Sequence, residues 1–386
     1  MTDYAGAGPL PLTVEYVPAG SRISAAARAI RMRDPGFGRV ATEHMVLIRW
    51  SADAGWHDAR LRPYAPLSLD PCAAGLHYGQ AVFEGLKAYP LADGGIGVFR
   101  PAEHARRLAN SARRLAMPEL PAAIFTQAVD ALVQADRDWI PADPGSSLYL
   151  RPLLFATEAS LGVHAASEYL FLVVACVAGP VPVSRPLKVW LCEDYARAAP
   201  GGTGAAKCPG NYAASLLVQE RARGYGCDQV VWLDPVHRDR VEEMGAMNIF
   251  FVFGPPEMPR LVTPPLTDTI LAGVTRDSLL TLARDLGYQV SEEPVSKARW
   301  RAASQDGTLI EAFACGTAAV VLPIGEVRSA SGSWTIGPGQ PGPVAARLRR
   351  ALMDLHRGVA PDRHGWLHRP RAATGVPAGH PYAQLR

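Results

Sequence analysis

The chain has 386 residues, of which 48% are hydrophobic and 19% are charged, and its formal net charge at pH 7 is +3. A chain of this length can bury a large core and is expected to divide into two domains. The small net charge, without a dense lysine and arginine run among aromatic residues, argues against a nucleic-acid-binding protein.

Targeting, membrane and metal-binding segments are not expected. Residues 1–18 lack the basic and apolar regions of a signal peptide. The most apolar stretch, residues 169–177, is too short to cross a membrane and is typical of a buried strand. The six cysteines are scattered and form no C-x-x-C pair, which argues against a zinc site or a disulfide framework. We therefore expect a cytoplasmic protein of enzyme size.

Hydrophobic periodicity predicts alternating strands and helices in the first half of the chain. Residues 103–117 carry apolar side chains at helical spacing, and Pro118 follows them. Residues 179–186 read GPVPVSRP, and their three prolines exclude a regular helix and predict a linker. The other elements expected before this linker are a helix at residues 124–133 and strands at residues 44–50, 147–155 and 169–177.

The alternation continues beyond the linker. Asn211 is the expected N-cap of a helix at residues 211–223, and Gly287 is the expected end of a helix at residues 275–286. Buried strands are expected at residues 187–192, 229–234 and 248–253. The fold class is therefore α/β or α+β. The predicted parts are a small N-terminal domain at residues 1–178 that opens with an extended segment at 1–35, an interdomain loop at 179–186, a large domain at 187–370 and a mobile tail at 371–386.

Lys207 is one of only four lysines in the chain, against thirty-five arginines. It follows the loop Gly201-Gly202-Thr203-Gly204 and precedes an expected helix start. A lysine, unlike an arginine, can lose its proton once it is desolvated or placed near other positive charge. One hypothesis is therefore a Schiff-base lysine, and the alternative for a single loop lysine is an ordinary solvated side chain.

Four groups that pyridoxal 5'-phosphate (PLP) requires each have a candidate. The cofactor needs a lysine, a partner for its pyridine nitrogen, an anion site for its phosphate and a hydrogen bond to its ring oxygen. Glu242 and Glu243 precede an apolar strand, and because successive residues of a strand face opposite sides, only one of them can face a site. Gly273 opens an expected helix whose first N–H groups, at Val274 and Thr275, could hold a phosphate. Tyr212, five residues after Lys207, could reach the ring oxygen.

The chain resembles the branched-chain amino acid aminotransferases, which are PLP enzymes of fold type IV. The likeness runs from about residue 37 to residue 370. The segments that carry it are LHY at 76–78, FEGLKAY at 83–89, FRP at 99–101, LYLRP at 148–152, SLGV at 160–163, GGTG at 201–204 followed by Lys207 and Tyr212, EMG at 243–245, MN at 247–248 and CGTA at 315–318.

The resemblance implies a two-domain fold type IV enzyme with a smaller N-terminal α/β domain and a larger, PLP-binding pseudobarrel domain. Lys207 would form the Schiff base and then act as general base, and Glu243, not Glu242, would pair with the pyridine nitrogen. Tyr212 would bond the ring oxygen. The phosphate would be held by Arg107, the Val274 and Thr275 amides, and Thr317.

For the substrate, the resemblance implies a carboxylate site at the Thr317 and Ala318 amides near Tyr149 and Arg151. The side-chain pocket would be lined by Phe37, Tyr78 and Phe83, and closed by Leu161 and Val163 of a second subunit, so that a homodimer is expected. The implied reaction passes the amino group of leucine, isoleucine or valine to 2-oxoglutarate, with ping-pong kinetics.

Three departures from the family leave the substrate open. Pro209 replaces the first of two glycines that usually precede Asn-Tyr, the linker is short and lacks an aromatic residue near Val181, and Ala319 and Leu322 stand where some animal members have a redox C-x-x-C. The alternatives are a specialised biosynthetic aminotransferase, a fold type IV lyase, and an impaired relative in which Pro209 spoils the geometry of the lysine.

Overall fold

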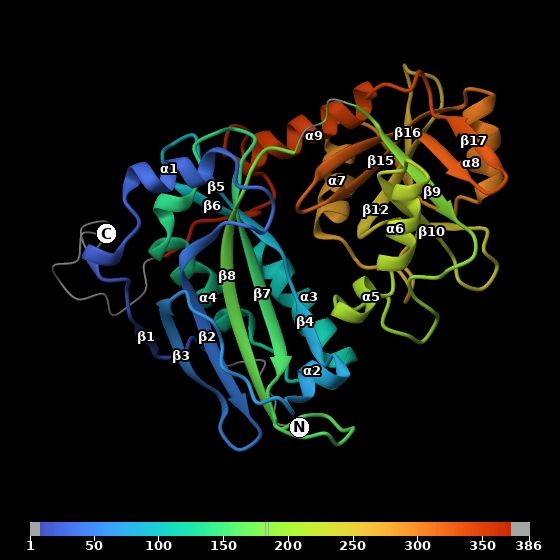
Figure 1. The fold of residues 1–386 in the computed structure, drawn as a ribbon. Coiled ribbons are helices and arrows are strands. Elements are labelled where there is room, and N and C mark those ends of the chain that lie inside the picture. Colours follow the sequence, from blue (N-terminus) through green and yellow to red (C-terminus); the bar gives the residue numbers. More distant parts are fainter. Residues whose placement is uncertain (1–7, 182, 184, 372–386) are drawn as a thin grey trace. The chain divides into compact units, whose positions relative to one another are not determined.

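The computed structural model describes residues 8–181, 183 and 185–371 (Figure 1). The chain divides into two compact units, here called unit 1 (Met1–Val181 with His356–Arg386) and unit 2 (Pro182–Leu355). The first change from one unit to the other falls within the proline-rich residues 179–186. No helix in the described part of the chain is both long and apolar enough to cross a membrane.

The chain returns to unit 1 after Leu355, which corrects the expectation that residues 187–370 form one domain. β18 (Leu367–His368) pairs antiparallel with β6 (Ile96–Phe99). Close to this pairing, His356 stacks on Tyr89 with ring centroids 4.6 Å apart. The predicted tail lies outside the described residues, apart from Arg371.

The N-terminal segment is not extended throughout, which corrects the expectation for residues 1–35. It contains β1 (Leu12–Val14), η1 (Ala19–Ser21) and α1 (Ala25–Arg33). Ser24 caps α1, because its Oγ accepts a hydrogen bond from the Ala27 N–H at 3.2 Å. None of the residues of α1 is fully buried, so the helix places no side chain in the core.

Unit 1 is built on one sheet with strand order β1-β3-β2-β8-β7-β5-β6-β18, and β4 pairs with β7 beside this path. The central strands β7 and β8 are mainly apolar, and α4 covers them by burying Phe125 6.1 Å from the ring of Phe171. The remaining elements are β2 (Ala41–Ser51), β3 (Gly55–Pro63), α2 (Ala74–Tyr78), β4 (Ala81–Phe83), β5 (Leu86–Pro90), α3 (Pro101–Arg114), α4 (Ala122–Ala135), η2 (Arg137–Trp139), β7 (Ser147–Ala156) and β8 (Glu168–Ala178).

Unit 2 contains the second sheet, with order β11-β10-β9-β16-β15-β12-β13-β14 and β17 paired with β16. β11 also pairs with β12, so six strands close into a ring, as expected for the pseudobarrel. Its elements are β9 (Leu187–Cys192), α5 (Pro209–Ala213), α6 (Leu216–Gly224), β10 (Gln229–Leu233), β11 (Val241–Met244), β12 (Met247–Phe253), β13 (Arg260–Thr263), α7 (Val274–Asp285), β14 (Gln289–Glu292), α8 (Lys297–Gln305), β15 (Leu309–Gly316), β16 (Val320–Ser329), β17 (Gly332–Thr335) and α9 (Pro343–His356), the last residue of which belongs to unit 1.

The helix expected at residues 211–223 is two helices, α5 and α6, and Asn211 lies inside α5 rather than at its N-cap. The buried Asn211 side chain instead holds the preceding loop: its Nδ2 donates to the Thr203 carbonyl at 2.7 Å and to the Ala206 carbonyl at 2.8 Å. Asparagine side chains form such local backbone bonds as readily as they form caps, so the residue type alone did not distinguish the two roles.

Glu311 anchors α9 to the sheet of unit 2, and its removal should destabilise that unit. Its carboxylate accepts hydrogen bonds from the Val344 and Ala345 N–H groups, each at 2.9 Å. Because Glu311 is buried, Glu311→Ala leaves both donors unsatisfied, and we expect a loss of about 1–3 kcal/mol in the free energy of unfolding. Urea denaturation followed by circular dichroism measures it. Glu311→Gln keeps one acceptor and should lose less; an equal loss in both variants would contradict the capping role.

Candidate active site

Lys207 lies in the loop before α5, and its Nζ donates a hydrogen bond to the Tyr212 hydroxyl at 2.8 Å. Pro209 does not disturb this contact, because it is the first residue of α5. At that position the missing N–H of proline would have no partner within the helix, and its fixed φ suits a helix start. The departure from the family pattern therefore leaves the amine and the phenol together.

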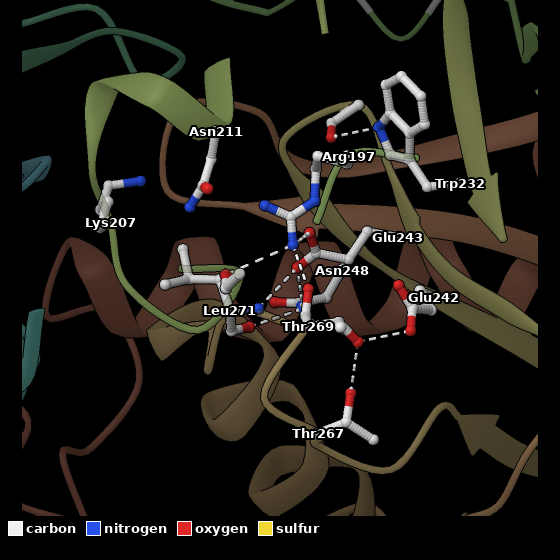
Figure 2. A network of polar contacts seen from close by, with 12 residues as sticks. Arg197, Lys207, Asn211, Trp232, Glu242, Glu243, Asn248, Thr267, Thr269 and Leu271 are labelled. Carbon is white, nitrogen blue, oxygen red and sulfur yellow. Dashed lines mark hydrogen bonds and ion pairs between the residues drawn. The ribbon is translucent and has the colours of Figure 1, made fainter. Parts of the chain in front are cut away.

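Glu243 is buried among polar partners on β11 (Figure 2). Its Oε2 pairs with the Arg197 guanidinium at 2.9 Å. Its Oε1 accepts from the Leu271 N–H at 3.1 Å and from Asn248 Nδ2 at 3.3 Å. Burial raises the pKa of Glu243 to about 7, although Arg197 acts in the opposite direction. The carboxylate is thus close to its protonation equilibrium at neutral pH.

Glu242 has different surroundings, as the alternation of a strand requires. It accepts a hydrogen bond from Thr269 Oγ1 at 2.5 Å, and the Thr267 hydroxyl lies 2.8 Å from that of Thr269 (Figure 2). Burial raises the pKa of Glu242 as well. Glu243, and not Glu242, lines a small cavity of unit 2, which is bounded by Arg197, Ala206, Asn211, Tyr212, Ser215, Glu243, Gly245, Ala246 and Leu271.

Asn248 connects this cavity to the start of α7. Its Nδ2 also donates to the Leu271 carbonyl at 3.0 Å. A Cβ atom added to Gly273 would lie 1.9 Å from Asn248 Oδ1, so only glycine fits between Asn248 and the helix. Gly273 is the N-cap of α7, the helix predicted here, and has no side chain with which to cap it. Val274 and Thr275 are the first two residues of that helix.

Thr317 and Ala318 lie in the turn between β15 and β16. β15 pairs with β12 so that Cys315 is opposite Asn248, which places this turn just beyond the end of the polar network. Cys315 is buried, and burial, with Glu243 adding to it, raises the pKa of its thiol. Unit 2 therefore gathers all the residues predicted from it at one end of the barrel-like sheet.

In unit 1, Arg107 lies on α3 and forms a two-pronged ion pair with Glu84. Its Nε and Nη2 lie 2.6 and 2.8 Å from the two carboxylate oxygens. His104 Nδ1 lies 2.7 Å from the same carboxylate. Although burial opposes ionisation, Arg107 and His104 hold the pKa of Glu84 well below its usual range. Arg107 is thus a rigidly oriented cation.

The predicted substrate residues of unit 1 form two groups. In the first, Arg151 Nη2 donates to the Tyr149 hydroxyl at 3.1 Å, Phe37 packs edge-on against Tyr149 with centroids 4.9 Å apart, and the Arg151 guanidinium lies 4.9 Å from the Phe83 ring centre. In the second, the Tyr78 hydroxyl donates to the Leu161 carbonyl. The Leu161 and Val163 side chains are 58% and 85% exposed, which is high for apolar residues.

Arg197 and Thr269 are part of the network around Glu243 but were not predicted from the sequence. Arg197 is one of thirty-five arginines and precedes Lys207 by ten residues in a loop without periodicity. Its pairing with Glu243 exists only because the fold brings the two loops and β11 together. No sequence signal distinguishes it.

Both the closed ring of strands and the grouping of a lysine, a tyrosine and a buried glutamate are typical of a cofactor-dependent transferase of fold type IV. The profile of the amino-transferase class IV family matches residues 81–327, and the chain belongs to this family. It is an aminotransferase.

Two relatives in this family are similar to the chain over most of its length. A protein of Streptomyces coelicolor named "Probable branched-chain-amino-acid aminotransferase" is 53% identical over 92% of this chain and 98% of its own length. The branched-chain-amino-acid aminotransferase of Mycolicibacterium smegmatis is 50% identical over 94% and 99%, respectively.

Solved structures agree with these relatives. The structure is similar to that of the Escherichia coli branched-chain amino acid aminotransferase, with a TM-score of 0.69 and 28% identity over 86% of this chain and 99% of the other. It is equally similar to a second branched-chain amino acid aminotransferase, from T.th., which is complexed with N-(5'-phosphopyridoxyl)-L-glutamate. Here the TM-score is 0.69, with 28% identity over 86% of this chain and all of the other.

Proposed function

We propose that the chain transfers the amino group of a branched-chain L-amino acid to 2-oxoglutarate with PLP as cofactor. The observation that carries the proposal is the Lys207 amine, 2.8 Å from the Tyr212 hydroxyl, in the same unit as the buried carboxylate Glu243. The names of the two bacterial relatives support the amino-acid class. The phosphopyridoxyl-glutamate complex of the second solved structure supports both the cofactor and glutamate as the second product.

The residues of unit 2 fit this cofactor. They include an amine that can be desolvated, a phenol beside it and a buried carboxylate close to its protonation equilibrium. They also include the N-terminus of a twelve-residue helix that has no side-chain cap. Lys207, Tyr212, Glu243, Val274, Thr275 and Thr317 would hold it, with Arg107 as the further phosphate ligand that the family implies. When bound, PLP supplies an electron sink that stabilises negative charge at the α-carbon of an amino acid.

Lys207 and Glu243 are the side chains proposed to act on the protons of the reaction. Lys207 Nζ, oriented by the Tyr212 hydroxyl, would take the proton from the α-carbon of the substrate and deliver it to the aldehyde carbon of the cofactor. Glu243, held by Arg197, would keep a proton on the ring nitrogen of the bound cofactor. Tyr149 and Arg151, with the Thr317 and Ala318 amides, would bind the substrate carboxylate.

The side-chain pocket would be lined by Phe37, Tyr78 and Phe83. The exposed Leu161 and Val163 support closure of this pocket in a homodimer, because apolar side chains as exposed as these gain from burial against a second copy. The cytoplasm, expected from cysteine usage, stays a prediction. A lyase fits less well, because a fold type IV lyase is not expected to share the pair formed by Tyr149 and Arg151.

Half-reaction rates test the substrate class. The holoenzyme is mixed with leucine, isoleucine, valine, phenylalanine or glutamate, and the absorbance of the bound cofactor is followed. We expect the three branched amino acids to react fastest among the neutral substrates, and glutamate to react as the product of the second half. Absence of any advantage over phenylalanine would favour the specialised aminotransferase, and absence of reaction with all five would favour the impaired relative.

A further inference from the structure

We propose that Arg197 is a positioning residue that fixes Glu243 and favours its ionised form near neutral pH. The inference rests on the proposed function only for its consequence, which is that the ring nitrogen of the cofactor can then hold a proton. Arg197 itself would not contact the substrate.

The contacts of Arg197 join three segments that are far apart in the sequence (Figure 2). Its Nη2 lies 2.9 Å from Glu243 Oε2 on β11, donates to the Thr269 carbonyl, and lies 3.4 Å from the Gly204 carbonyl. The side chain is 9% exposed. A Cβ atom on Gly204 would lie 2.5 Å from the Thr269 Cα, so the glycine allows the two loops to pack closely beneath the guanidinium.

The charges around Glu243 explain why an arginine is needed there. Burial is the largest influence and raises the pKa of Glu243, and the neighbouring Glu242 acts in the same direction. Among the positive charges, Arg197 lowers the pKa of Glu243 most, and Lys207 has a smaller effect in the same direction. The neighbouring strands contribute the neutral Asn248 side chain and the thiol of Cys315, and Arg276 is the cation that acts to lower the pKa of that thiol. Glu243 without Arg197 would therefore be mainly neutral at pH 7.

A neutral Glu243 would leave the site poorly suited to its task. A Glu243 that keeps its proton could offer the ring nitrogen only a hydrogen bond, whereas a carboxylate stabilises a proton on that nitrogen. An adjacent guanidinium lowers the pKa of a carboxyl by about 1–3 units. Loss of Arg197 should therefore raise the pH at which Glu243 ionises by about that amount, since the charged form loses its main stabilising partner.

The test compares Arg197→Gln and Arg197→Met with the unaltered protein. In cofactor-free protein, infrared difference spectra against Glu243→Gln follow the carboxyl band of Glu243 as the pH is changed. We expect its midpoint to move from about 7 to higher pH by about 1–3 units in both variants, and to be largely restored in Arg197→Lys. An unchanged midpoint in both neutral variants would overturn the inference.

The same variants are then loaded with PLP. We expect the affinity for PLP at pH 7 to fall by about tenfold or more and to recover as the pH is raised, because affinity then depends on Glu243 ionising. Arg328→Gln, which removes an ion pair with Glu326 elsewhere in unit 2, is the control and should leave both titration and affinity unchanged. Loss of affinity at every pH, with an unchanged infrared titration, would indicate a merely structural role. Failure of the unaltered protein to bind PLP would refute the proposed function but not the infrared result.

Discussion

Replacing Lys207 by alanine is expected to lower the rate of the leucine half-reaction by at least about 10²–10⁴-fold. Loss of the general base alone accounts for a factor of this size. Lys207→Arg should be equally impaired although it keeps the charge, because a guanidinium does not lose its proton in a protein. Single-turnover absorbance measurements on the PLP-loaded variants give the rates.

The control for this experiment is Lys188→Ala, which removes a lysine paired with Glu326 at the surface of unit 2. It should react at the rate of the unaltered protein. Borohydride reduction of the holoenzyme followed by peptide mapping should label the peptide that contains Lys207. A label on another lysine, or a Lys207→Arg variant with full activity, would refute the assignment.

Removal of the Glu84 carboxylate is expected to lower the free energy of unfolding by about 3–5 kcal/mol, the usual cost of breaking one partner of a buried ion pair. Glu84 is fully buried, and Glu84→Ala would leave the Arg107 guanidinium and the almost fully buried His104 without the carboxylate that both contact. Urea denaturation of the variant measures the loss. Glu119→Ala removes an exposed carboxylate that pairs with Arg113, and should change stability far less.

The pH dependence of this loss has a defined sign. Because the folded pKa of Glu84 is lowered, its stabilisation is fully present above the unfolded pKa of about 4.5 and is lost as the pH falls toward the folded value. The difference between the unaltered protein and Glu84→Ala should therefore be constant near neutral pH and shrink in acid. A difference that stayed the same down to the acid limit of folding would show that packing, rather than the ion pair, is responsible.

Elements whose signal is local agree well with the structure. The strand predicted at residues 187–192 is β9 without a change of boundary, and the helix predicted at 275–286 is α7, shifted by one residue. Gly287 follows α7 with φ +84°, as expected of a residue that ends a helix. These segments are bounded by turn residues and bury one continuous face, so neighbouring residues already contain the needed information.

Two predictions were wrong, for different reasons. Asn211 is predicted to be an N-cap but instead holds the Thr203 and Ala206 carbonyls, because asparagine forms such local backbone bonds as readily as it forms caps. The return of residues 356–371 to unit 1 depends on the pairing of β18 with β6, and so short a strand has no pattern of its own. Only in this second case does the deciding partner, β6, lie far away in the sequence.

The candidate site shows the same difference between what the sequence indicates locally and what depends on the fold. The sequence by itself determined the residue types: a rare lysine in a glycine-rich loop, a tyrosine five positions later, and one carboxylate of an adjacent pair. Only the tertiary structure decided that Pro209 is harmless, since it begins a helix, and that Glu243 is held by Arg197. The physical reason is that covalent order records which groups are present, whereas the burial and neighbouring charges that set their protonation arise only when separate segments pack together.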